Sequence, residues 1–206
     1  MTETQLLVAT TNQGKKREIE AELAKLPVRI FSLFELDISE SFPETGRTFL
    51  ENARGKSLFY SRKWKGITLA EDSGLEIKYL KGAPGVLSAR FSGPQATDEE
   101  NNTKVLRLLE GVPGEKRQSR FVSCMVLSQS GNIITEIEAW VDGYISPEQR
   151  GENGFGYDPI FYYPPLEKTF GQLSPEEKNK VSHRGRALMK LKEFLKDYEG
   201  PAQADP

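Results

Sequence analysis

Two long β-rich runs constrain the fold of this chain more than any other feature. "RFVSCMVLS" and "NIITEIEAWV" lie on either side of a turn at residues 129–131, which predicts an antiparallel hairpin. The rest of the chain mixes short apolar strands with helical patterns, which is typical of an α/β fold. Because the hairpin is antiparallel, we expect a mixed central β-sheet rather than a purely parallel one.

The other elements are predicted from hydrophobic spacing and capping residues. Apolar runs predict strands at "LLVAT", "VRIFSL", "ITLAE", "LEIKYL" and "PIFYY", with "DSG" as a turn between the third and the fourth. Helical spacing marks "KKREIEAELAKL" and "RGRALMKLKEFLKDY". Further helices begin after Thr48, Thr97 and Ser174, each followed three residues later by the glutamate of a capping box. The polar segment at residues 34–47 is predicted to be a loop.

The composition fits a soluble globular protein. The 206 residues, 37% hydrophobic and 28% charged, suffice for one domain, which we expect at residues 1–198 with a flexible tail at 199–206. A net charge of -2 gives no overall attraction to nucleic acid or to an anionic membrane. No apolar run is long enough for a membrane span, and "LLVA" is too short for a signal peptide. Cys124, the single cysteine, is expected to be a buried thiol in a cytoplasmic protein.

The stretch "ATTNQGKKRE" passes from a strand through a polar turn into a helix. A helix N-terminus offers unpaired N–H groups and the positive end of its dipole, which suit phosphate. Thr10, Thr11 and Asn12 add hydroxyl and amide groups, and Lys15 adds positive charge. The spacing of a P-loop is absent. The residues alone leave two interpretations open, an anion site or a capped surface helix with a solvated basic face.

Two acidic segments are candidates for holding a metal ion or a proton. Glu71 and Asp72 end a predicted strand, where ligands of α/β sheets bind, although "DSG" also forms a good turn. Adjacent strand residues point to opposite faces, so we expect only one of the two to face a site. Glu44, in the 34–47 loop, is a further carboxylate, and Mg²⁺ is held by few carboxylates together with phosphate oxygens and water. Glu51 ranks behind Glu44 because the capping box already explains it.

The stretch "GENGFGYDPIF" at residues 151–161 is dense in glycines and aromatic rings. Glycines allow positive φ and let a backbone approach a ligand closely. An aromatic ring on such a loop, such as Phe155, can stack on a planar base. The alternative is a glycine-rich turn whose rings, Phe155 and Tyr157, fold into the core.

The stretch "SPEEKNKVSHRGRAL" gathers positive charge near the junction of two predicted helices. Lys178, His183 and Arg184 lie there, and His183 is the single histidine of the chain. A guanidinium such as that of Arg184 can donate to carbonyl or phosphate oxygens. A lone histidine is more often structural than catalytic, and the alternative interpretation is a solvated basic helix start.

These motifs, taken together and in order, resemble the inosine triphosphate pyrophosphatase family. The resemblance rests on "ATTNQGKKREI", "PETGRTFLENA", "EDSGLEI" with "GAPGVLSARFSG", "GENGFGYDPIF" and "SPEEKNKVSHRGRAL", and it spans residues 6–195. It implies an enzyme that cleaves the α–β phosphoanhydride of ITP, dITP or XTP to the monophosphate and pyrophosphate, which cleanses the nucleotide pool. It also implies dependence on Mg²⁺, a homodimer, and an elongated two-lobed α/β fold with a central nucleotide cleft.

The resemblance also implies roles for residues at matching motif positions. Asp72 would accept a proton, and Glu44 and Asp72 would hold Mg²⁺. The implied substrate-binding residues are Thr10, Thr11, Asn12, Gln13, Gly14, Lys15, Ser73, Phe155, Gly156, Tyr157, Asp158, Lys178, His183 and Arg184. Two positions depart from the family pattern, in which glycine often stands at Thr11 and aspartate at Glu71. These departures leave open how closely the backbone approaches phosphate near Thr11 and whether Glu71 supports the site.

Elementary chemistry relates these residues to the implied reaction. Cleaving a phosphoanhydride needs charge neutralisation, for which Lys15 is a candidate, and a carboxylate beside the attacking water, for which we choose Asp72. Hypoxanthine and xanthine carry an acceptor oxygen at position 6, where adenine carries an amino donor. Donors such as Arg184 and His183 therefore favour ITP over ATP, and Asp158 is an acceptor for the N1–H that adenine lacks. The residues leave open how GTP would be rejected.

Three other functions compete with this one. A related pyrophosphatase could act on pyrimidine or modified nucleotides, and a nucleotide-binding module could use the same residues without turnover. The pair of carboxylates, Glu44 and Asp72, counts against the non-catalytic module. A nucleic-acid binder is disfavoured because the net charge is -2 and no extended basic stripe is present. We therefore expect a purine nucleotide as the partner, and neither nucleic acid nor membrane.

Overall fold

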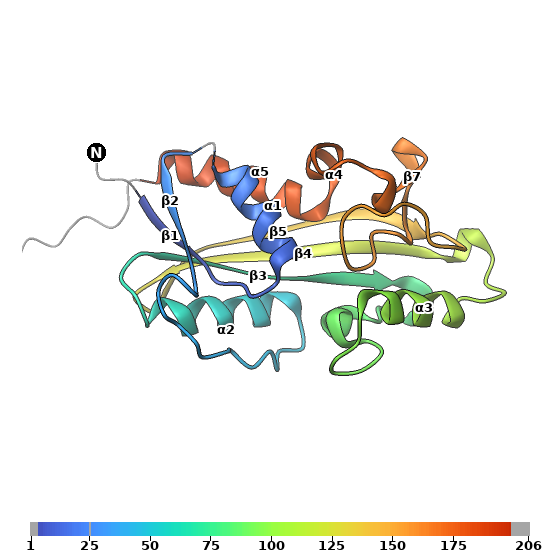
Figure 1. The fold of residues 1–206 in the computed structure, drawn as a ribbon, viewed down its shortest axis with the longest axis horizontal. Helices are drawn as coiled ribbons and strands as arrows, with labels where there is room; N and C mark the ends of the chain where they lie inside the picture. The colour runs from blue at the N-terminus through green and yellow to red at the C-terminus, as the bar shows by residue number, and fades with distance from the viewer. Residues whose placement is uncertain (1–3, 25, 199–206) are drawn as a thin grey trace, which may run out of the picture.

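A mixed sheet runs through the length of the molecule (Figure 1). The computed structural model describes residues 4–24 and 26–198, so the tail expected at 199–206 lies outside the described residues. Within them, seven strands follow the order β2-β1-β3-β4-β5-β6-β7, of which β2, β1 and β3 are parallel and the later pairs antiparallel. The strands are β1 Thr4–Val8, β2 Val28–Ser32, β3 Ile67–Ile77, β4 Gln118–Gln129, β5 Asn132–Ile145, β6 Phe161–Tyr163 and β7 Lys168–Thr169. The predicted mixed sheet is confirmed.

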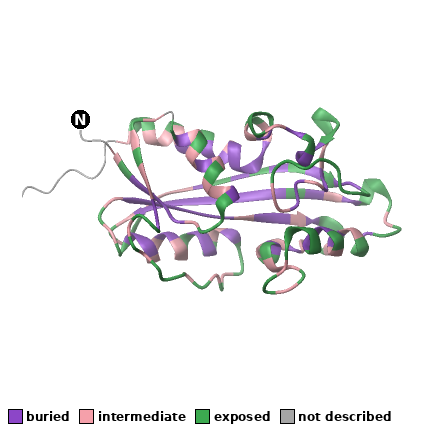
Figure 2. Cartoon of the chain, in the orientation of Figure 1, coloured by how far each residue is buried: buried purple, intermediate pink, exposed green. Residues whose placement is uncertain are grey.

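Helices cover both faces of this sheet, with α1, α4 and α5 on one face and α2 and α3 on the other (Figure 1). Their bounds are α1 Gln13–Leu23, α2 Phe49–Ser61, α3 Asp98–Leu108, α4 Pro175–Val181 and α5 His183–Asp197. Leu6, Ile19 and Leu188 belong to the core that α1 and α5 form with the sheet, and Phe49 and Val122 to the core under α2. Figure 2 shows the long strands buried between the layers and the outer helix faces exposed.

The strand β3 corrects the predicted turn at "DSG". It continues unbroken through Asp72, Ser73 and Gly74, each paired with a residue of β4. The backbone hydrogen bonds of this antiparallel partner outweigh the local turn preference of the three residues. As a result, Glu71 and Asp72 lie in the middle of a strand at the centre of the sheet rather than at a strand end. The predicted strand "LEIKYL" also ends early, because Lys78–Leu80 forms a short 3₁₀ helix.

Two of the three predicted capping boxes are complete. Thr97 and Ser174 exchange hydrogen bonds with the glutamates three residues later, at the starts of α3 and α4. At the start of α2, Thr48 accepts from the Glu51 N–H, but the Glu51 carboxylate accepts from the backbone N–H of Arg47 at 2.7 Å. That box is therefore incomplete, although Glu51 is still occupied in capping, as expected.

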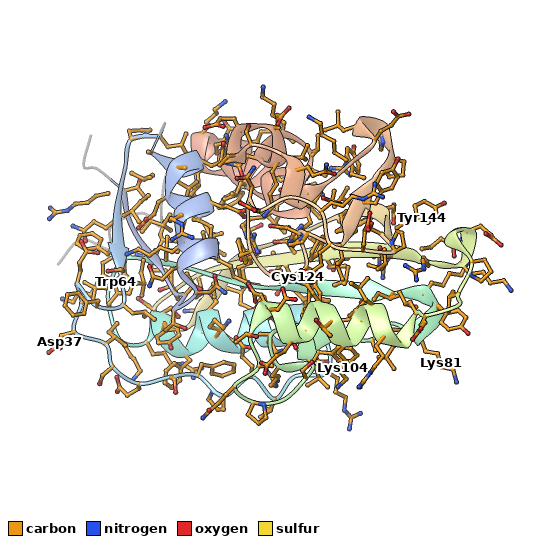
Figure 3. The ribbon with its side chains drawn as sticks, turned by 45° about the vertical axis from the view of Figure 1, so that its right-hand side comes forward. Asp37, Trp64, Lys81, Lys104, Cys124 and Tyr144 are labelled. Atoms are coloured by element: carbon orange, nitrogen blue, oxygen red, sulfur yellow. The ribbon has the colours of Figure 1, made fainter. Side chains whose placement is uncertain are left out.

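The elements gather into two lobes joined by the long strands β3, β4 and β5 (Figure 1). One lobe contains β1, β2 and α2, and the other contains α3, α4, β6 and β7. Cys124 lies in the interior near the centre, as Figure 3 shows, and its predicted burial is confirmed. Among the described residues, no helix has both the length and the apolar character to cross a membrane.

Candidate functional site

A cavity of about 410 Å³ opens between the two lobes, and we call it the central cavity. This volume is in the range of small-molecule sites. Fourteen of the predicted site residues line the central cavity: Thr10, Thr11, Asn12, Lys15, Glu44, Asp72, Ser73, Phe155, Gly156, Tyr157, Asp158, Lys178, His183 and Arg184. Gln13 and Gly14 do not line it, since Gln13 is exposed and Gly14 is buried under Phe155. Motifs from all parts of the chain therefore meet in one place.

The turn between β1 and α1 is organised by its own side chains. Asn12 caps α1 by accepting the Lys15 N–H at 2.9 Å, and its own N–H donates to the Thr10 hydroxyl at 3.2 Å. The Lys15 side chain lies 3.9 Å from Glu71. Burial lowers the pKa of Lys15, against the opposing charges of Glu71 and Asp72. The alternative of a solvated basic face therefore does not apply to Lys15.

Asp72 and Glu44 face the central cavity from different segments. The Asp72 carboxylate accepts from the Asn52 amide at 2.9 Å, while Glu44 is paired with the ammonium of Lys56. Burial raises the pKa of Asp72; the charge of Lys15 opposes this and that of Glu44 adds to it. Glu71 does not line the cavity, in agreement with the expectation that only one of the adjacent acids faces a site.

The two carboxylates fit the ligand set of Mg²⁺. Within the described part of the chain, no cluster of three or more histidine, cysteine, aspartate or glutamate side chains is placed to hold a metal ion. Mg²⁺ nevertheless needs only one or two protein carboxylates when substrate phosphates and waters complete its shell. Glu44 and Asp72 offer such hard oxygen ligands, and the Glu44 charge that raises the pKa of Asp72 is one that a cation would offset.

Asp158 organises the loop at residues 151–161, which forms part of the wall of the central cavity. Its carboxylate accepts from the Phe155 N–H at 2.9 Å and from the Lys178 ammonium at 2.5 Å. The Lys178 ammonium lies 4.7 Å from the centre of the Phe155 ring. On α1, a side chain at Gly14 would come within 2.6 Å of that ring, so the glycine makes room for it. The ring is half-buried at the cavity wall.

Tyr157 separates the two interpretations of the aromatic loop. Its ring is buried in the core, and its hydroxyl donates to the Ser88 carbonyl at 2.7 Å. The core interpretation therefore describes Tyr157 better, although the residue also borders the central cavity. Phe155 remains the candidate for stacking on a base.

Arg184 is almost fully buried and already holds three partners. Its guanidinium binds both oxygens of Glu71, at 2.9 and 3.1 Å, donates to the Ser73 hydroxyl at 2.9 Å, and pairs with Glu18. Burial alone would raise the pKa of Glu71, but the charges of Arg184 and Lys15 hold it far below its usual range. Glu71 thus positions Arg184 from behind the site, and its extra methylene is compatible with that role.

His183 lies against Phe121, with the ring centres 4.6 Å apart and the rings nearly parallel. The imidazole is buried, and its Nδ1 has no hydrogen-bond partner within the described part of the chain. Burial and the charge of Arg184 lower its pKa well below the usual value, so the ring is neutral. Because Lys178, His183 and Arg184 are all buried, the alternative of a solvated basic helix start is wrong.

Several site residues escaped the sequence analysis. Asn52 and Lys56 on α2 hold Asp72 and Glu44, and Glu18 on α1 pairs with Lys178 and Arg184. The one available signal was spacing, because Lys15 and Glu18 are three residues apart and share a helix face. The partners of Glu18 lie some 160 residues away in sequence, so no local pattern reveals them.

Comparisons with known proteins agree with this arrangement. A sequence profile of the Ham1 family matches residues 6–194. The dITP/XTP pyrophosphatase of Thermoanaerobacter pseudethanolicus is 47% identical over 190 residues, covering 92% of this chain and 96% of that protein. The dITP/XTP pyrophosphatase of Caldanaerobacter subterraneus is 48% identical over 191 residues, covering 92% and 95%. The solved HAM1 protein of Coxiella burnetii superposes with a TM-score of 0.87 at 38% identity, covering 95% of this chain and 100% of that one.

Proposed function

This chain belongs to the Ham1 family, and from that premise we propose that it hydrolyses the non-standard purine nucleotides ITP, dITP and XTP to the monophosphate and pyrophosphate. One observation carries the proposal: a single cavity is lined both by the carboxylates of Asp72 and Glu44 and by the Phe155 ring with the buried cations beside it. Asp72 and Glu44 suit the phosphate end, and Phe155, Lys178 and Arg184 suit the base end. The matched relatives are named dITP/XTP pyrophosphatases, which supports dITP and XTP among these substrates.

In the proposed reaction, the residues around the phosphates have different roles. Mg²⁺, held by Glu44 and Asp72, would neutralise phosphate charge when bound. Lys15 at the start of α1 adds positive charge, and the N–H groups of the first helical turn donate to phosphate oxygens. Asp72 orients a water toward the α-phosphorus and accepts its proton, which its raised pKa favours. Holding the substrate and the water in one reactive geometry supplies much of the rate enhancement.

The base end favours a purine with an oxygen at position 6. Phe155 offers a ring face for stacking, and Lys178 and Arg184 lie within 4.7 and 5.4 Å of its centre. The neutral His183, with an unpartnered Nδ1, adds a group that hydrogen-bonds without charge. Donors placed here accept a 6-oxo purine and oppose the 6-amino group of adenine.

We further propose a homodimer that works in the cytoplasm. Trp140 and Tyr144 share one face of β5 and remain 46% and 36% exposed, and large exposed rings favour an interface. Figure 3 shows Tyr144 at the outer edge of the molecule. The buried free thiol of Cys124 is consistent with a reducing compartment such as the cytoplasm.

The proposed substrate class is tested by comparing kcat/KM for ITP, XTP, GTP, ATP, UTP and dTTP with Mg²⁺ present. We expect ITP to exceed ATP by about 10⁴-fold, the scale on which a hydrogen-bonding site rejects a mismatched analogue. An inactive variant, purified in parallel, controls for contaminating phosphatases. Equal values for ITP and ATP would contradict the role of the base end, and a preference for UTP or dTTP would favour a pyrimidine enzyme.

A further inference from the structure

Among the described residues, one positively charged side chain of the central cavity forms no ion pair with a carboxylate. The lining lysines and arginines are Lys15, Lys56, Arg90, Lys178 and Arg184. Four of them form ion pairs with glutamate or aspartate. Arg90 forms none within the described part of the chain, and its guanidinium donates to the backbone carbonyl of Glu44 at 3.3 Å. Its charge is therefore available to an anionic ligand.

The segment that carries Arg90 is seated directly on β3. Gly85–Arg90 forms a 3₁₀ helix, and Ser88 within it accepts the Leu75 N–H at 2.9 Å. A side chain at Gly74 would come within 2.2 Å of the Ser88 hydroxyl, so only glycine allows this approach. The glycine of "EDSG", expected in a turn, instead brings the "GVLSAR" segment against the sheet.

A second set of contacts fixes the backbone on both sides of Arg90. Asn101 on α3 donates to the Ala89 carbonyl at 3.3 Å and accepts the Ser92 N–H at 2.8 Å. The Tyr157 hydroxyl holds the Ser88 carbonyl at 2.7 Å. Because the backbone is fixed, little ordering is needed for the guanidinium to meet a ligand.

Arg90 lies beside Glu44 in the central cavity. Its guanidinium contacts the backbone carbonyl of Glu44, which places it next to the candidate metal site. Burial alone would raise the pKa of Glu44, but the charges of Lys56, Lys15 and Arg90 together hold it below its usual value. These three cations thus surround one end of the cavity from α2, α1 and the Gly85–Arg90 helix.

We propose that Arg90 binds the leaving pyrophosphate and thereby makes the enzyme select triphosphates over diphosphates, an inference that rests on the proposed function. In the reaction, the water oxygen bonds to the α-phosphorus and its proton passes to Asp72. The bond from the α-phosphorus to the bridging oxygen breaks, and its electron pair stays on pyrophosphate. The leaving group gains negative charge, and a guanidinium is suited to two phosphate oxygens at once.

The test compares Arg90→Gln, which removes the charge, with Arg90→Lys, which keeps it. Arg107→Gln, on the exposed face of α3, removes the same charge outside the central cavity and serves as the control. Binding of pyrophosphate and of IMP is measured directly by calorimetry with Mg²⁺, and kcat/KM is measured for ITP and IDP. We expect Arg90→Gln to weaken pyrophosphate binding and to lower kcat/KM for ITP about 10- to 100-fold, with IMP binding and IDP turnover little changed.

Arg90→Lys should retain most of the pyrophosphate affinity, and Arg107→Gln should retain all of it. Unchanged pyrophosphate binding in Arg90→Gln would overturn the inference. An equal loss of IMP and pyrophosphate binding would also overturn it, since it would assign Arg90 a structural role. Failure of the proposed function is separate, because it would leave the wild-type protein without pyrophosphate release from ITP.

Discussion

Asp72 is the residue on which the proposed chemistry most depends. We expect Asp72→Asn to lower kcat for ITP by about 10²- to 10⁴-fold, the usual contribution of a positioned general base, while nucleotide still binds. Asn keeps the size of the side chain and its contact with Asn52 but cannot accept a proton. Asp142→Asn, exposed on β5, is the matched control. Near-normal turnover by Asp72→Asn would remove this residue from the mechanism.

The pH dependence belongs to the same residue. Burial raises the pKa of Asp72, so the carboxylate takes up a proton at a higher pH than an ordinary aspartate. The protonated form cannot accept the proton of water. The kcat/KM of the wild-type protein should therefore fall with decreasing pH through a pKa above about 4, the usual aspartate value. If kcat/KM fell only with a pKa at or below about 4, the assignment of Asp72 as the proton acceptor would be contradicted.

At the scale of elements, α2 links the two carboxylates of the site. Asn52 on α2 donates to Asp72 at 2.9 Å and accepts the N–H of Gly46 at 2.7 Å, two residues beyond Glu44. One amide thus joins the 34–47 loop to β3. The contact with Asp72 is buried and the contact with Gly46 is partly buried, so losing the amide removes a hydrogen-bond partner from each.

We expect Asn52→Ala to raise the Mg²⁺ concentration that gives half-maximal activity and to lower kcat about 10-fold, because the two proposed ligands, Asp72 and Glu44, would lose their fixed positions. Arg54→Ala, on the exposed side of the same helix, is the control and should change neither quantity. Unfolding in denaturant would separate loss of stability from loss of positioning. An Mg²⁺ dependence identical to that of the wild type would show that Asn52 does not couple the two segments.

The elements also show how far sequence reasoning reaches. Helix starts at Thr97 and Ser174 were predictable because a capping box lies within four residues of sequence. The conformation of the "DSG" segment was not predictable in this way, because it is set by pairing with β4, some 50 residues away. The site residues followed from the resemblance to a family, which the Ham1 profile confirms. Asn52 and Arg90 did not, since their contacts exist only once distant segments have folded together.

At the scale of the whole molecule, a buried charge network joins the base end to the sheet. Glu18 from α1 and Glu71 from β3 share Arg184 at the start of α5, and Lys178 from α4 connects Glu18 to Asp158. Buried charges persist where each has a partner of opposite sign. Under the proposed function, this network would hold the base-binding residues in place relative to Asp72 and so contribute to selecting the point of cleavage.

The most direct test of that selection is hydrolysis of ITP in water labelled with heavy oxygen, followed by mass spectrometry of both products. With Asp72 placing the water at the α-phosphorus, the label should appear in IMP, and the other product should be unlabelled pyrophosphate. Orthophosphate as the primary product, or label carried by pyrophosphate, would contradict attack at the α-phosphorus and with it the function proposed for the central cavity.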